Sequence, residues 1–106
     1  MTLAALVNAG HEVAIWSGRS DQVRPQTERW LNKYIRVYLS KSQPGPYLTM
    51  RPHKDYTPDD ELKRGWLANM RERGRSVELV FDDRDRVVKM WREEGVPCFQ
   101  VAPGDF

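Results

Sequence analysis

The hydrophobic positions of this chain alternate between helical and strand spacing, with polar turns between them. Residues 2–9 predict a first helix, which Gly10 would close because glycine adopts the left-handed conformation easily. The apolar run EVAIW at 12–16 predicts a strand, since a polar turn follows it directly. A second helix is expected over 24–39, and its apolar face carries Trp30, Leu31, Tyr34 and Ile35.

The second half of the chain continues the alternation. Turn-forming residues at 40–47 lead to a short strand at 47–50. Thr57 before Pro58 predicts the N-cap and first turn of a helix that ends at Gly74. Its inward positions are Leu62, Trp66, Leu67 and Met70. The remaining predicted elements are a buried strand at 77–81, a helix at 83–94 that Gly95 closes, and a strand at 97–102.

Strands that alternate with helices at this spacing predict an α/β fold. We expect a three-layer, mainly parallel, Rossmann-like sheet of about four strands, because right-handed crossovers join parallel strands. Ligands of such sheets gather at the carboxyl ends of the strands. The turn SGRS at 17–20 follows one predicted strand and DDRD at 82–85 follows another. The sequence therefore predicts that Ser17 and Asp82 share one sheet edge.

Composition narrows the class of protein. The 106 residues are expected to form a single domain, and a net charge of +2 is too small to require nucleic acid as a partner. The only cysteine, Cys98, excludes an internal disulfide and lies in an apolar run, where we expect a buried, unreactive thiol in a reducing, cytoplasmic setting. No segment approaches the roughly 18 apolar residues of a membrane span, and no basic leader precedes residues 2–9, so we expect no membrane partner.

Two polar segments and one lysine could carry chemistry. Ser17, Gly18 and Arg19 offer a hydroxyl, backbone N–H groups and a guanidinium to a phosphate, although an ordinary turn has the same composition. Lys63 lies four residues after Asp59, which on its own predicts a solvated helix pair.

Asp82 and Asp83 are adjacent like charges at the end of a predicted strand. They could cap the following helix and supply its first-turn acid, which needs only one of them. The second carboxylate favours a divalent cation such as Mg²⁺, which takes carboxylate and phosphate oxygens together.

These segments together resemble a known family. WSGRS, DELKRGWL and LVFDDRDRVVKMWREEGVPCFQVAPGDF are similar to the second, third and fourth motifs of the haloacid dehalogenase-like phosphatases, and most of all to the 3′-phosphatase domain of bacteriophage polynucleotide kinase. The last block is the most specific, because its acids, the MWR helix and the ending FQVAPGDF occur together and in register.

The resemblance implies a magnesium-dependent attack of an aspartate on phosphorus, followed by hydrolysis of the aspartyl-phosphate. It implies that Ser17, Gly18 and Arg19 bind the phosphoryl group of a phosphorylated nucleic-acid end. It further implies that Lys63 balances charge on nucleophile and phosphate, and that Asp82 and Asp83 hold Mg²⁺. Arg51 is a further candidate phosphate contact, although the residues around it match poorly.

This chain differs from the family in its first motif. A D-x-D-G-T segment at the end of the central strand supplies the nucleophile and general acid in that family, and no such segment occurs here. In that fold the missing strand lies between those ending at Trp16 and Phe81. Its absence would leave two unpaired edges, which either close directly on one another or pair with another chain. As that other chain we expect a second copy of this one or an N-terminal companion chain.

Three interpretations follow from this departure. The chain is a truncated or split polynucleotide 3′-phosphatase-like domain that is inactive alone, or a non-enzymatic module for phosphate binding or assembly. In the third, the reading frame continues upstream, and an in-frame D-x-D-G-T about 25 to 35 residues before Met1 would restore the enzyme.

Overall fold

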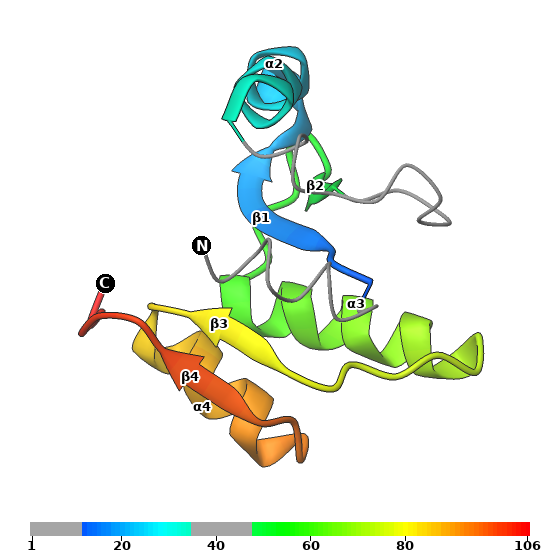
Figure 1. The fold of residues 1–106 in the computed structure, drawn as a ribbon, viewed down its shortest axis with the longest axis vertical. Coiled ribbons are helices and arrows are strands. Elements are labelled where there is room, and N and C mark those ends of the chain that lie inside the picture. Colours follow the sequence, from blue (N-terminus) through cyan, green and yellow to red (C-terminus); the bar gives the residue numbers. More distant parts are fainter. Residues whose placement is uncertain (1–11, 35–47) are drawn as a thin grey trace. The chain divides into compact units, whose positions relative to one another are not determined.

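The computed structural model describes residues 12–34 and 48–106 of the chain (Figure 1). They belong to two compact units, which we call unit 1 (Met1–Asp55) and unit 2 (Tyr56–Phe106), and each is described by itself. The predicted helix at 2–9 and the end of the one predicted over 24–39 lie outside the described residues.

Unit 1 is a small parallel β-sheet with a helix. Its elements are β1 (Ile15–Ser20), a short 3₁₀ helix η1 (Asp21–Val23), α2 (Arg24–Tyr34) and β2 (Leu48–Arg51). The two strands pair in parallel with Ile15 opposite Leu48. Their core is made by Leu31, Leu48 and Met50, with Ile15 and Val23 packed against it.

Two predictions for unit 1 need correction. β1 does not end at Trp16 but continues to Ser20, with an irregularity between Ser17 and Ser20 where the pairing with β2 shifts. Trp30, expected on the inward face of α2, is 55% exposed. Adjacent residues of a helix point about 100° apart, and Leu31 occupies the buried position, so Trp30 is turned away from the core.

Unit 2 contains a compact β-α-β arrangement and a further helix. Its elements are α3 (Asp59–Glu72), β3 (Val80–Asp82), α4 (Asp85–Glu93) and β4 (Cys98–Gln100), and β3 pairs in parallel with β4 (Figure 1). Helix α4 buries one face, formed by Val87, Val88, Met90 and Trp91. Gly74 and Gly95 follow α3 and α4 with φ of 76° and 79°, which confirms the predicted helix ends.

Several local predictions for unit 2 are wrong. Thr57 is not the N-cap of α3, because Pro58 takes that position without a side-chain cap. The predicted buried strand at 77–81 is shorter, and its Phe81 side chain is 46% exposed. Phe81 stacks on Phe99 of β4 at 5.7 Å between ring centroids, on a sheet face that α4 does not cover. Strand alternation alone could not tell which face is covered.

The α/β class with parallel strands is confirmed, although the described strands form two two-stranded sheets, β1-β2 and β3-β4. A single sheet of four strands and a single domain stay predictions, since each unit is described by itself. Over 12–34 and 48–106, no helix is long and apolar enough to cross a membrane.

Candidate functional site

The predicted phosphate-binding segment lies on an irregular part of β1. Gly18 and Arg19 fall in the register shift between Ser17, which pairs with Met50, and Ser20, which pairs with Arg51. The Arg19 backbone N–H donates to Ser17 Oγ at 3.2 Å, so the segment bends on itself. A bulge of this kind re-aims the side chains of a strand, and the Arg19 side chain is exposed.

Arg51 supports this bulge from the neighbouring strand. Its Nε donates to the Gly18 carbonyl oxygen at 2.7 Å, and its Nη1 donates to the carbonyl of Asp55 at 3.1 Å. The sequence suggested a phosphate contact for Arg51, whereas these two hydrogen bonds give it a structural role. Only the strand register, which sequence spacing does not reveal, places it beside Gly18.

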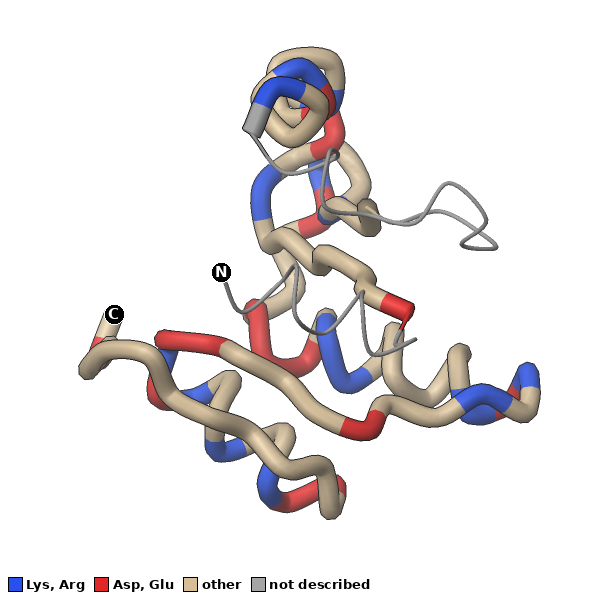
Figure 2. The backbone as a smooth tube through the Cα atoms, in the orientation of Figure 1, with Lys and Arg blue, Asp and Glu red and all other residues tan. Residues whose placement is uncertain are grey.

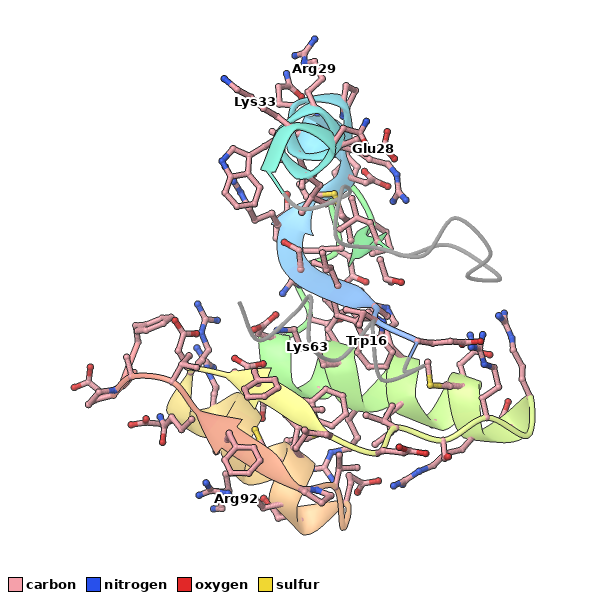
Figure 3. All side chains as sticks on the ribbon, viewed as in Figure 1. Trp16, Glu28, Arg29, Lys33, Lys63 and Arg92 are labelled. Carbon is pink, nitrogen blue, oxygen red and sulfur yellow. The ribbon has the colours of Figure 1, made fainter. Side chains whose placement is uncertain are left out.

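Lys63 lies in a buried charge cluster near the start of α3 (Figure 3). Its Nζ is 3.5 Å from Asp59 Oδ2 and 3.4 Å from Asp82 Oδ2. The Asp59 and Lys63 residues are only 8% and 7% exposed, so the prediction of a solvated pair is wrong. In Figure 2 the first turn of α3 is acidic and basic residues follow it at once.

Asp59 and Arg84 complete the cluster, and the sequence interpretation gave neither of them a role in the site. Arg84 Nη1 lies 3.7 Å from Asp59 Oδ2, so two carboxylates and two cations balance one another. Such balance is needed because an unpaired charge at this degree of burial is strongly unfavourable. The spacing of four between Asp59 and Lys63 was the available signal, but it does not report burial.

Asp82 organises the turn that follows β3. Its Oδ1 accepts hydrogen bonds from the backbone N–H of Asp83 at 2.8 Å and of Arg84 at 3.3 Å. The prediction that Asp82 or Asp83 caps α4 is wrong, since Arg84 is the N-cap without a side-chain cap and Asp85 is the first-turn acid. Asp82 is therefore held by a lysine on one oxygen and by backbone on the other.

Asp83 differs from its neighbour in having an exposed side chain. Within the described ranges, no hydrogen bond or ion pair engages its carboxylate. Asp83, Arg84 and Asp85 have the spacing D-x-D, but no Gly-Thr follows, and Asp85 Oδ1 accepts from Gln100 Nε2 at 2.6 Å. Asp85 is thus engaged in holding the fold of this loop.

Cys98, at the start of β4, is a buried free thiol. Burial, and next the nearby negative charge of Asp82, raise the pKa of this thiol above its ordinary value of 9.0. The predicted buried thiol is confirmed, and the raised pKa keeps it protonated and poorly nucleophilic near neutral pH.

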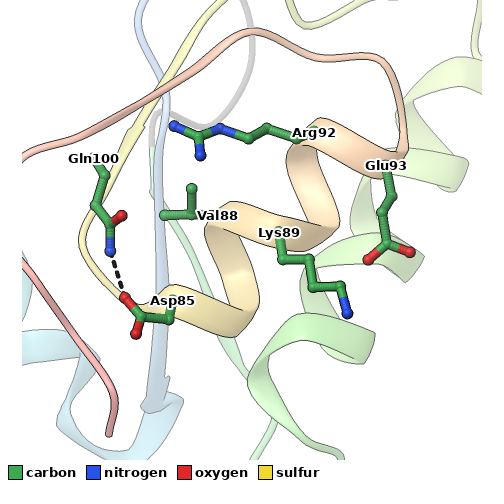
Figure 4. A pocket seen from close by; sticks show the side chains of 6 residues that line it. All are labelled: Asp85, Val88, Lys89, Arg92, Glu93 and Gln100. Atoms are coloured by element: carbon green, nitrogen blue, oxygen red, sulfur yellow. Dashed lines mark hydrogen bonds between the residues drawn. The ribbon is translucent and has the colours of Figure 1, made fainter.

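A shallow hollow of about 420 Å³ lies beside α4 (Figure 4). Its lining residues are Asp85, Val88, Lys89, Arg92, Glu93 and Gln100. None of the predicted site residues lines it, and its two carboxylates offset its two cations.

The structure therefore brings Lys63 and Asp82 together in unit 2, next to the exposed Asp83. Ser17, Gly18 and Arg19 lie in unit 1. A common edge for Ser17 and Asp82 stays a prediction, because the two units are described separately.

Comparison with known proteins identifies relatives of this chain. A family model described as the polynucleotide kinase PNKP phosphatase domain matches residues 1–106. A putative bifunctional polynucleotide kinase/RNA ligase of Autographa californica nuclear polyhedrosis virus is 34% identical over 85 residues, covering 80% of this chain and 11% of the viral protein.

Two solved structures are similar over the full chain. One is described as the structure of the Pnkp1/Rnl/Hen1 RNA repair complex, with 37% identity, a TM-score of 0.84 and coverage of 32% of that chain. The other, described as the structure of the Pnkp1/Rnl/Hen1 complex, has 37% identity, a TM-score of 0.83 and coverage of 35%. This chain thus spans about a third of the solved chains and about a tenth of the viral relative.

Proposed function

Because this chain belongs to the polynucleotide kinase PNKP phosphatase-domain family, we propose that it serves magnesium-dependent hydrolysis of a phosphate monoester at the 3′ end of a polynucleotide. The observation that carries the proposal is the buried Lys63–Asp82 pair, 3.4 Å apart, beside the exposed Asp83. A fixed cation and a free carboxylate at one loop suit a reaction in which a phosphoryl group and its metal must be held together.

Each candidate residue has a distinct role in this proposal. Ser17, Gly18 and Arg19 bind the phosphoryl oxygens, since the bulge leaves the Arg19 side chain exposed while Arg51 anchors Gly18. Lys63 is the charge-balancing catalytic residue. Its ion pairs to Asp59 and Asp82 fix the ammonium group at the end of a stem that is otherwise flexible.

Asp82 and Asp83 are the proposed ligands of Mg²⁺. This pair fits the ion, because Mg²⁺ is usually held by one or two carboxylates together with phosphate oxygens and water. Among the described residues no cluster of three or more acidic, histidine or cysteine side chains suggests another metal site. When bound, Mg²⁺ would neutralise the negative charge of the phosphoryl oxygens. The carboxylates of Asp82 and Asp83 would hold the ion, and Asp82 Oδ1 also holds the turn.

We further propose that this chain alone does not turn over substrate. Its 106 residues contain no D-x-D-G-T segment to provide the nucleophile and general acid. A segment outside these residues or a partner chain supplies that motif. The similar solved structures are described as complexes, which supports the involvement of partner chains.

The test is release of phosphate from a 3′-phosphorylated oligonucleotide with MgCl₂. We expect none with the chain alone, and release when the segment or partner with the D-x-D-G-T motif is present. In the completed enzyme, Asp83→Asn should abolish release, whereas Arg64→Met, a change to a half-exposed residue next to Lys63, should leave it unchanged. Release by the chain alone, or no release by the completed enzyme, contradicts the proposal.

A second candidate function is a non-enzymatic assembly module. The exposed, stacked pair Phe81–Phe99 favours it, because a contiguous apolar sheet face is a common protein contact. In that case the chain would bind its partner normally, but the assembly would not release phosphate. The same assay, run beside a measurement of association by light scattering, separates the two functions.

A further inference from the structure

The last seven residues, Gln100–Phe106, which we call the tail, lie against the turn that carries Asp82 and Asp83. The Val101 N–H donates to the Asp82 carbonyl at 3.1 Å, and Gln100 Nε2 donates to the Asp83 carbonyl at 3.0 Å. Both predicted metal ligands are therefore held through their backbone by the tail.

Asp85 ties the other end of the turn to the tail. Its Oδ1 accepts from Gln100 Nε2 at 2.6 Å, as Figure 4 shows, and from the Gly104 N–H at 3.1 Å. Its own N–H donates to the Gly104 carbonyl at 2.6 Å. This reciprocal pairing joins residues that are nineteen positions apart.

Two further features show that the contact is close. Gly104 is buried, and a Cβ added there would collide with the backbone carbonyl of Asp83, so only glycine fits. The Arg84 guanidinium lies 4.8 Å from the centre of the Phe106 ring, a cation–π distance. The tail thus meets each residue of the turn from Asp82 to Asp85.

We propose that the tail is a positioning device for the Asp83 carboxylate, an inference that rests on the proposed function. A carboxylate on a free loop would sample many directions, whereas a turn fixed at its carbonyls limits the Asp83 carboxylate to the directions that its side-chain rotamers allow. Gln100, Asp85 and Gly104 are positioning residues, because they reach the metal and phosphate only through the Asp83 backbone. Groups that orient metal ligands in this way typically change metal affinity by about 10–100-fold when removed.

The test is calorimetric titration of MgCl₂ into the full chain with inorganic phosphate present. Gln100→Ala should weaken binding by about tenfold or more while leaving the thermal unfolding midpoint almost unchanged, since Gln100 is exposed. Asp85→Ala should have a similar effect, and Asp85→Asn should restore most of the affinity because its amide oxygen still accepts hydrogen bonds. Asp105→Asn, an exposed tail residue, is the matched control and should bind as the wild type.

A second measurement distinguishes failure of the positioning role of the tail from failure of the proposed function. Hydrogen exchange of the Asp83 and Arg84 amides should accelerate in Gln100→Ala if the tail holds the turn. Unchanged affinity in folded Gln100→Ala and Asp85→Ala overturns the positioning role alone. A wild-type chain that binds no Mg²⁺ with phosphate overturns the proposed function and, with it, the role of the tail, even where the exchange data show a clamped turn.

Discussion

The SGR segment of unit 1 and the DDRD segment of unit 2 both belong to the end of a parallel strand, yet different groups hold them. In unit 1 the guanidinium of Arg51 donates a hydrogen bond to the Gly18 carbonyl. In unit 2 the segment is held by buried side-chain charges on one side and by the tail on the other. The comparison indicates that a segment at the end of a parallel strand can be fixed by a hydrogen bond to its backbone or by buried charge balance, with different sensitivity to mutation.

The largest effect is expected from breaking the charge balance in unit 2. Lys63→Met should lower the free energy of unfolding by about 3 kcal/mol, because it leaves Asp59 and Asp82 facing each other with little solvent. Urea unfolding followed by circular dichroism would measure it. Arg64→Met is the matched control, with an expected loss below about 1 kcal/mol, since its side chain is 42% exposed. Equal losses in the two variants would show that the buried cluster is not what stabilises this unit.

Removal of the guanidinium from unit 1 should have a smaller effect. Arg51→Met deletes hydrogen bonds to the carbonyls of Gly18 and Asp55, for which we expect a loss of about 2 kcal/mol. Thermal or urea unfolding gives the value, with Arg29→Met on the exposed side of α2 (Figure 3) as the control within about 0.5 kcal/mol. If Arg51→Met lowered the free energy of unfolding as much as Lys63→Met does, the two segments would not differ in their sensitivity to mutation.

Substitution of two glycines measures how much a helix end contributes to the stability of unit 2. Gly95→Ala should cost about 1 kcal/mol, because φ is 79° at this position. Gly65→Ala should instead stabilise by up to about 1 kcal/mol, since Gly65 lies within α3 with open space around an added Cβ. Differential scanning calorimetry of both variants is the measurement. The same sign for both changes would contradict the assignment of Gly95 as the left-handed helix end.

The smallest effect concerns pH and Cys98. Burial and Asp82 raise the folded-state pKa of this thiol above 9.0, so its contribution to stability is complete below the unfolded pKa and is lost as pH rises through the folded pKa. Cys98→Ala should therefore reduce the fall in stability between about pH 8 and pH 10. Urea midpoints across this range would show it, and an identical alkaline fall in the two proteins would refute it.

The sequence predicted well what depends on neighbouring residues. The helix ends at Gly74 and Gly95 and the parallel α/β class follow from local spacing and turn chemistry. The resemblance to a known family directed attention to Lys63 and Asp82, which the fold brings within 3.4 Å of each other.

Features that depend on distant residues could not be predicted. The spacing of Asp59 and Lys63 is the same for a solvated pair and a buried one, and only the packing of Asp82 and Arg84 against them decides. Similarly, the role of Arg51 depends on the register between β1 and β2. Helical periodicity placed both Trp30 and Leu31 on the inward face, although only Leu31 is buried and Trp30 is 55% exposed.

The parallel pairing in the two units also has a consequence for the order in which the chain folds. Val80 pairs with Cys98 across 18 positions, whereas Ile15 pairs with Leu48 across 33. Closing the longer loop costs only about 0.5 kcal/mol more entropy. Each loop contains a helix, α2 in the longer and α4 in the shorter, so the difference lies in sequence separation, and contacts between residues that are closer in the sequence form faster. Unit 2 should therefore nucleate on β3-α4-β4, and the turn carrying Asp82 and Asp83 would acquire its shape before the SGR bulge does.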